Sequence, residues 1–195
     1  MANRADTTYM ISGSRKAVND LWVAITNLGV NNKDVYLDKL AEFYGIDYKK
    51  KMISVRGYIY FADLSEDEEH DRYVLTIDTD TGWNGCHELF HAINEVLWNE
   101  MTISYREIET GMDIYNVHDE EGFFPEICCV SSSGEPFDEL TGDVYNTVED
   151  AISEWCELTG ESRGELTEEE MMDYINEYEY TCDDTYFYIN RFCQV

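Results

Sequence analysis

The sequence predicts an α+β fold, and two observations support this class. Along the first two thirds of the chain, apolar spacing switches between the helical period and strand alternation, in the order strand, helix, strand, strand, helix, strand. In the last third of the chain, acidic segments with helical spacing follow. The order is that of a split βαβ, ferredoxin-like core. We therefore expect such a core with extra antiparallel strands and an acidic helical C-terminal extension. The 195 residues, 44% of them hydrophobic, suffice for a sizeable core.

The first elements follow from local patterns. A strand is expected at 7–12 and a helix at 14–27, which Gly29 would end. A second helical segment is expected at 37–44. The apolar residues that predict the first helix are Val18, Leu21, Trp22 and Ile25.

Alternation and helical spacing then predict the rest of the core. An acidic loop is expected at 65–69. The other expected elements are strands at 55–61 and 73–79, a helix at 85–99, and strands at 102–108, 112–117 and 124–130.

A change in composition predicts a domain boundary. Nine of the 13 basic residues lie between Arg4 and Arg56, whereas Arg163 is alone among the carboxylates of 134–184. The small residues at 131–134 resemble a linker. We therefore expect a core domain at 1–130 and an acidic α/β extension at 131–195, packed on the core.

Within the extension, two helices and a last strand are expected. Thr147 and Thr167 each begin an acidic segment that resembles a capping box. Apolar stripes then predict buried helix faces, and alternation at 186–192 predicts the strand. The stripe residues are Val148, Ile152, Trp155, Met171, Met172 and Ile175.

The net charge of −29, from 42 acidic and 13 basic residues, limits the partners. Direct binding to nucleic acid or to an anionic membrane surface is disfavoured, because both need a basic surface. A basic protein partner is favoured. The beginning of the chain has no apolar segment typical of a secretory signal, so we expect a cytoplasmic protein.

The six cysteines show no metal-ligand or redox spacing. In a reducing compartment this pattern favours buried free thiols. The cysteines are Cys86, Cys128, Cys129, Cys156, Cys182 and Cys193.

Five stretches carry a resemblance to a known family. They are TYMISG at 8–13, RGYIYF at 56–61, LTIDTDTGW at 75–83, ISYREIETGM at 103–112 and HDEEGFFP at 118–125. Residues 7–130 thereby resemble the YubB ferredoxin-like domain family, whose members are accessory proteins of phages, plasmids and related elements. The resemblance implies a fold and a mobile-element setting, but no established activity. The acidic C-terminal third lies outside it.

One motif could carry chemistry. His87-Glu88-Leu89-Phe90-His91 is H-E-x-x-H on an expected helix, so both imidazoles could reach one Zn²⁺ and Glu88 could act as general base. A third ligand would be required. The downstream candidates are Glu107, Glu109, His118 and Asp119.

The alternative interpretation is a surface or partly buried histidine pair, because the helix would only just have begun at Asn84 and Gly85. Asp78 and Asp80 would share one face of a strand and could bind a divalent cation. An acidic sheet edge is the more common meaning of such a pair.

The acidic helices could present one partner-binding surface. Its candidate residues are Glu149, Asp150, Glu154, Glu157, Glu161, Glu168, Glu169 and Asp173. The alternative is a solvated acidic face that keeps the protein soluble.

We therefore expect a non-enzymatic acidic interaction protein of a mobile genetic element without a cofactor. It would bind a basic protein surface, as a DNA mimic or an anti-defence factor would. The alternatives are a zinc-dependent hydrolase using His87, Glu88 and His91, and a structural or dimerisation module.

Overall fold

The computed structural model describes residues 3–195 and divides into two compact units. Unit 1 reaches to Phe123, and unit 2 runs from Phe124 to Val195. The α+β class is confirmed. Within the described part of the chain, none of the helices combines the length and apolar composition needed to cross a membrane.

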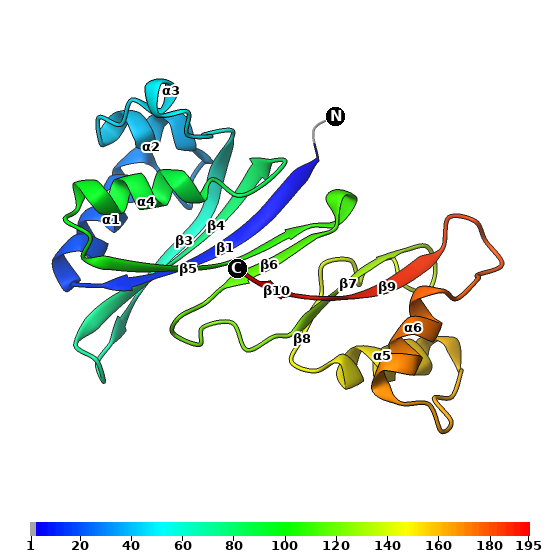
Figure 1. Ribbon diagram of the computed structural model, residues 1–195. Coiled ribbons are helices and arrows are strands. Elements are labelled where there is room, and N and C mark those ends of the chain that lie inside the picture. Colours follow the sequence, from blue (N-terminus) through cyan, green and yellow to red (C-terminus); the bar gives the residue numbers. More distant parts are fainter. Residues whose placement is uncertain (1–2) are drawn as a thin grey trace. The chain divides into compact units, whose positions relative to one another are not determined.

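Unit 1 places its helices on one face of an antiparallel sheet (Figure 1). The strands lie in the order β6-β5-β1-β4-β3-β2. The strands are β1 (Arg4–Gly13), β2 (Val35–Tyr36), β3 (Gly57–Asp67), β4 (Arg72–Gly82), β5 (Met101–Glu109) and β6 (Ile114–His118). The helices are α1 (Arg15–Leu28), α2 (Leu37–Phe43), α3 (Tyr48–Lys51), α4 (His87–Val96) and the 3₁₀ turn η1 (Thr110–Met112).

The central strands β5-β1-β4-β3 are linked by α1 between β1 and β3 and by α4 between β4 and β5. This connection is the one expected from the strand-helix-strand-strand-helix-strand pattern. The ferredoxin-like classification itself stays a prediction.

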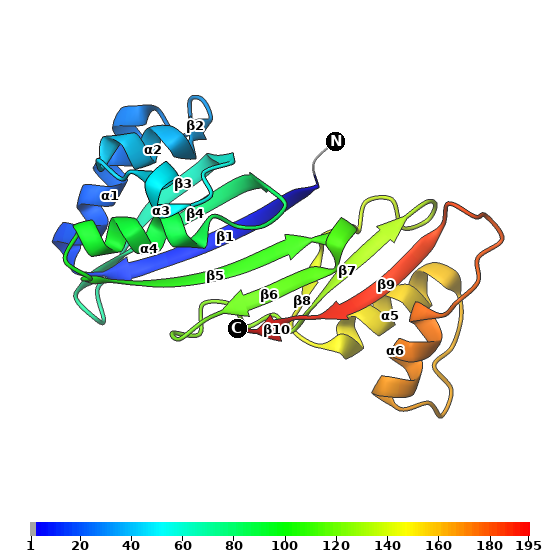
Figure 2. The ribbon, with the colours of Figure 1, turned by 45° about the horizontal axis from the view of Figure 1, so that its top comes forward.

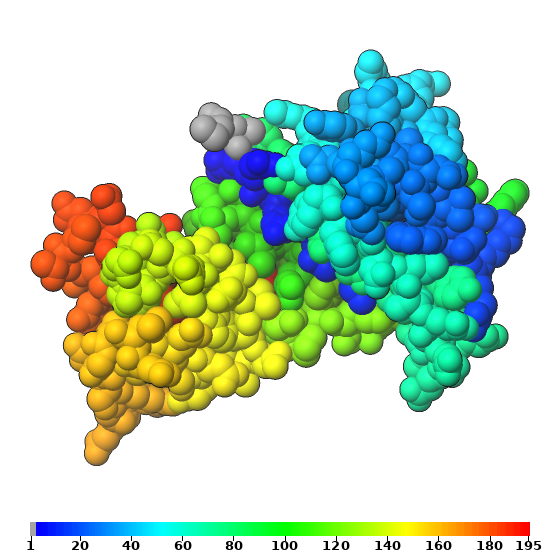
Figure 3. Space-filling model, turned by 180° about the vertical axis from the view of Figure 1, so that it is seen from behind, coloured from blue at the N-terminus to red at the C-terminus, as the bar shows by residue number. Residues whose placement is uncertain are grey.

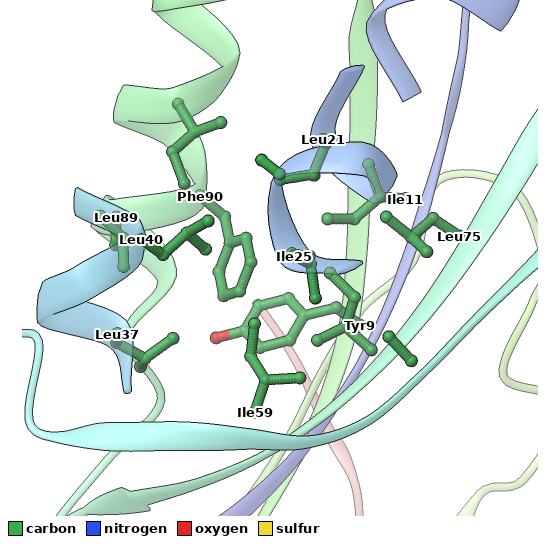
Figure 4. Close-up of a cluster of buried hydrophobic side chains, with 14 of the residues drawn as sticks. Tyr9, Ile11, Leu21, Ile25, Leu37, Leu40, Ile59, Leu75, Leu89 and Phe90 are labelled. Atoms are coloured by element: carbon green, nitrogen blue, oxygen red, sulfur yellow. The ribbon is translucent and has the colours of Figure 1, made fainter. Parts of the chain in front are cut away.

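The core of unit 1 lies between the sheet and the helices (Figure 4). Tyr9 of β1 is fully buried, and its ring lies 4.3 Å from that of Phe90 on α4, measured between centroids. Leu21 and Ile25 bring the apolar stripe of α1 into the same cluster. The stripe therefore buries the face of α1 that the spacing predicts.

Unit 2 places two helices against a three-stranded antiparallel sheet of order β8-β7-β9 (Figure 2). Its core gathers around Trp155, Phe137 and Phe187, all fully buried. The elements are β7 (Cys128–Ser133), β8 (Val144–Tyr145), α5 (Val148–Thr159), α6 (Glu168–Asn176), β9 (Tyr186–Arg191) and the short β10 (Cys193–Gln194).

Several expected boundaries differ from the structure. The linker expected at 131–134 is wrong, because Ser131, Ser132 and Ser133 belong to β7 and pair with β9. The expected domain boundary after residue 130 therefore falls inside a strand, and the compact units divide seven residues earlier.

Two other elements are shorter or longer than expected, and three short ones were not expected. The helix expected at 85–99 covers only His87–Val96, since Trp98 and Asn99 have positive φ angles that a helix excludes. The strand expected at 55–61 extends to Asp67 through residues assigned to an acidic loop, because these pair with β4. The short elements β2, α3 and β8 were not expected.

The expectation for the cysteines is confirmed only in part. All six are free, and Cys86, Cys128 and Cys129 are buried. Cys182 and Cys193 are exposed, so the expected burial is wrong for these two thiols.

Candidate functional site

The acidic side of α5 is fixed by the burial of its opposite side. Thr147 begins the helix, and its hydroxyl accepts a hydrogen bond from the backbone N–H of Asp150 at 3.1 Å. Val148, Ile152 and Trp155 are buried in the core of unit 2. The carboxylates between them consequently face solvent or lie half-buried at the surface.

The α6 helix is held in the same way. Thr167 and Glu170 form a full capping box, and Met171 and Ile175 are buried. Arg191 of β9 reaches two carboxylates in the first turn, Glu168 at 2.8 Å and Glu169 at 2.6 Å. The strand and the N-terminus of the helix are thereby linked through charge.

The structure places seven of the eight expected partner-binding residues on these two helices. Glu161 does not belong to the face of α5, because Gly160 ends that helix in the left-handed conformation with a φ of 74°. Its carboxylate instead accepts a hydrogen bond from the Tyr178 hydroxyl at 3.4 Å.

Few cations balance this surface. Unit 2 contains 19 Asp and Glu residues and only two basic residues, a net charge of −17. Both arginines are paired, Arg163 with Glu149 and Arg191 with Glu168 and Glu169. Within residues 3–195, the other five expected carboxylates form no salt bridge. These are Asp150, Glu154, Glu157, Glu161 and Asp173.

The outer side of α5 borders two cavities, of about 440 and 510 Å³. Both are lined by Glu154 and Leu158. The Tyr145 hydroxyl donates a hydrogen bond to Glu154 at 2.6 Å. Burial, and then the negative charge of Glu154, raise the pKa of Asp143. The α5 surface therefore combines concave shape with uncompensated negative charge.

The H-E-x-x-H motif lies on α4, where His87 is the first helical residue. The His87 ring stacks on Tyr105 with 3.7 Å between centroids. Its Nδ1 lies 3.0 Å from the Tyr9 hydroxyl, and its Nε2 lies 3.3 Å from a carboxylate oxygen of Glu107. Both ring nitrogens of His87 are thus engaged with other residues.

Glu107 lies on β5 and is 3% exposed. Its carboxylate also accepts hydrogen bonds from the backbone N–H of Gly85 and from the Asn116 side chain. Burial raises the pKa of Glu107, but the hydrogen bonds from His87 and Gly85 outweigh this and hold the pKa below its usual value. Glu107 thus acts as a charged anchor for the beginning of α4.

His91 lies one helical turn after His87 but faces a different environment. It lines a cavity of about 200 Å³ together with His118, whose ring stacks on Tyr105 with 5.5 Å between centroids. Partial burial and the neighbouring His87 and His118 lower the pKa of His91. Tyr105 therefore stacks with both His87 and His118.

The other residues proposed for zinc chemistry have neighbours different from those of His87. Glu88 is exposed and lines a cavity of about 350 Å³ with Lys51 and His91. Glu109 accepts a hydrogen bond from the Gly111 backbone, and Asp119 accepts two from the turn that follows it.

No group of three or more His, Cys, Asp or Glu side chains is placed to hold a metal ion within residues 3–195. Zinc binding by His87 would require it to leave either Tyr9 or Glu107.

Asp78 and Asp80 share a face of β4, as their spacing predicts. The Thr8 hydroxyl donates to Asp78 at 2.8 Å, and Arg4 donates to Asp80 at 2.7 Å. Burial raises the pKa of Asp78. Both donors belong to β1. Because β4 lies between β1 and β3, the expected acidic edge is wrong, and the two carboxylates lie on a sheet face instead.

Sequence reasoning missed two sets of residues. Tyr9 and Tyr105 were not recognised as neighbours of His87, although alternation places Tyr105 and Glu107 on one face of the strand. Tyr145 and Leu158 were not recognised beside the acidic helix. The signal for Leu158 is an apolar residue directly after Glu157 in a strongly acidic segment.

Comparison of the chain with protein-family models, with curated proteins and with solved structures gives no match. The resemblance to the YubB ferredoxin-like family stays a prediction.

Proposed function

We propose that this protein is a non-enzymatic interaction protein whose acidic unit 2 binds a basic surface of another protein. The observation that carries the proposal is the charge of unit 2, 19 carboxylates against two arginines that are already paired. Five carboxylates of the expected surface remain without a salt bridge among the described residues.

A basic partner would supply the missing counter-charge. Uncompensated like charges repel one another, and lysines or arginines from a partner would relieve this repulsion. Complementary charge also accelerates association, which makes binding steeply dependent on salt. Because helix caps and buried stripes hold α5 and α6 in place, their carboxylates need little reordering on binding.

A nucleic-acid-binding protein is the partner class that we favour, because its surface is already adapted to a row of negative charges. Duplex DNA carries one phosphate charge per about 1.7 Å of axis. Carboxylates one helical turn apart are separated by about 5.4 Å, so α5 and α6 would have to act together. A mobile-element setting, in which such a DNA mimic would block a host defence protein, is supported by the family resemblance alone.

The proposal is tested by retaining basic proteins from a lysate on the immobilised full-length chain, at low and high salt. We then expect D150N/E157Q/D173N to weaken binding of the retained protein about tenfold, since each exposed charge pair contributes roughly 0.5 kcal/mol. The matched control is D63N/E68Q/E69Q, three exposed carboxylates of unit 1.

Two outcomes would contradict the proposal. One is that no basic protein is retained even at low salt. The other is that the control variant loses as much affinity as the variant of unit 2, because the effect would then reflect net charge rather than a surface.

A further inference from the structure

The outer side of α5 has the shape of a groove. The cavity of about 440 Å³ is lined by α5 itself and by Tyr145 of β8, and the cavity of about 510 Å³ by α5 and the segment 135–140. Glu154 and Leu158 line both cavities. We call these two cavities the α5 groove. In Figure 3, α5 and the preceding segment (yellow to yellow-green) lie side by side at the surface of unit 2.

The charged lining of the α5 groove is entirely acidic. Neither cavity has a lysine or an arginine among its lining residues, all of which belong to the described chain. The acidic lining residues are Asp150, Glu154 and Glu157 in the first cavity, and Glu135, Asp138, Glu139 and Glu154 in the second.

Apolar side chains also line the groove. Leu158, 39% exposed, is common to both cavities, and Leu140 and Pro136 belong to the second. Tyr145 contributes its ring to the first cavity, while its hydroxyl is held by Glu154. The groove is therefore amphipathic, which a simple solvated acidic face does not require.

This combination matches the side chains of lysine and arginine. Both carry an apolar stem that packs along apolar surface and a charged head that stays at a polar rim. A stem along Tyr145 would bring its head toward Glu154 or Glu157, and a second stem over Leu140 would meet the carboxylates of the neighbouring cavity. An apolar side chain between the two could cover Leu158 itself.

We infer that the α5 groove binds an exposed peptide segment of a basic protein, in which lysines or arginines flank an apolar residue. The inference rests on the proposed function and deepens it. It assigns recognition to α5 and to Leu158, and it leaves to α6 only the long-range attraction of the partner.

The test measures binding of a short fluorescent peptide, two lysines on either side of one leucine, to the full-length protein at low salt by fluorescence anisotropy. A second peptide replaces the leucine with serine. The variants are E154Q and L158A in the groove, with E165Q, an exposed carboxylate between α5 and α6, as the charge-matched control.

We expect E154Q to weaken binding of the leucine peptide about two- to fivefold. L158A should weaken it several-fold, with no effect on the serine peptide. E165Q should change either affinity less than twofold. Circular dichroism of each variant checks that unit 2 remains folded.

Other outcomes overturn the inference without overturning the proposed function. Equal weakening by E154Q and E165Q, with no effect of L158A, would show attraction by general charge. Equal affinities for the two peptides would show that the apolar lining takes no part. Failure of both peptides, with a basic protein still retained from the lysate, would exclude a short segment as the ligand.

Discussion

Glu107 shows how a buried charge is stabilised in unit 1. Its carboxylate accepts hydrogen bonds from Gly85, His87 and Asn116 and lies at the beginning of α4. No side chain caps this helix at Cys86. A negative group at a helix N-terminus is favourable, and here a strand supplies it. The first histidine of H-E-x-x-H therefore contributes to packing between α4 and β5.

We predict that E107Q lowers the free energy of unfolding by about 2 kcal/mol at pH 7, because charged hydrogen bonds to a buried group are replaced by neutral ones. The pKa of Glu107 in the folded protein lies below its ordinary value of 4.5. The stability that its charge contributes is therefore present above pH 4.5 and is lost as the pH falls through the folded pKa. Urea unfolding of both proteins at pH 7 and pH 3 measures the difference.

The difference between wild type and E107Q should shrink at pH 3, because this lies below the ordinary pKa of 4.5 and the unfolded wild-type chain then gains the proton. The exposed variant E68Q provides the control and should change stability by less than about 0.5 kcal/mol at either pH. An equal loss for E107Q at both pH values would show that shape, and not charge, is what Glu107 provides.

At the scale of elements, three asparagines make the same pair of hydrogen bonds to a strand. Each places its side-chain amide against a strand residue, so that it accepts from the backbone N–H and donates to the backbone carbonyl of that residue. Asn31 does this with Ala62, just after the bulge in β3. Asn94 on α4 does so with Met101, and Asn176 on α6 does so with Ile189.

We predict that N176A lowers the free energy of unfolding by about 2 kcal/mol. Ile189 is buried, and loss of the amide leaves its backbone N–H and carbonyl without these partners. The control N146A removes an exposed asparagine of unit 2 and should cost less than about 0.5 kcal/mol. Thermal unfolding followed by circular dichroism measures both, and equal costs would exclude a special role for Asn176.

Helices with local signals could be predicted from the sequence. α1 carries its apolar stripe and its terminal residues Ser14 and Gly29 within one segment, and its observed bounds differ from the prediction by one residue. The segment at 131–133 could not be assigned, because its serines pair with β9, more than 50 positions later in the sequence. Ser132 donates to the Phe137 carbonyl, and Asn190 donates to Ser131.

Of the candidate residues, those whose position depends on one helix could be predicted, and those whose contacts join distant parts of the sequence could not. Helical spacing identified the carboxylates of α5 and α6, since their positions depend on buried stripes within the same helices. The contacts of His87 with Tyr9 and Glu107 join residues 78 and 20 positions apart in sequence. Spacing on one helix carries no information about such contacts, so the motif suggested a metal ligand.

At the scale of the whole molecule, the charge is unevenly divided. Unit 2 has a net charge of −17, whereas unit 1 has 23 acidic and 11 basic residues and a net charge of −12. Unit 2 is also the smaller unit, so its charges are closer together. Repulsion between like charges destabilises a compact state, and it should therefore act more strongly on unit 2.

We predict that salt stabilises unit 2 more than unit 1. The Debye length falls from about 30 Å at 0.01 M to about 3 Å at 1 M salt, which screens repulsion among surface carboxylates. Hydrogen–deuterium exchange should then slow more for peptides from β9 than for peptides from β1 as NaCl is raised. In E165Q/E177Q/D184N, which removes three exposed charges from unit 2, the gain for β9 should shrink while that for β1 stays the same. An equal or larger gain for β1 in the wild type would mean that the concentration of charge in unit 2 does not limit its stability.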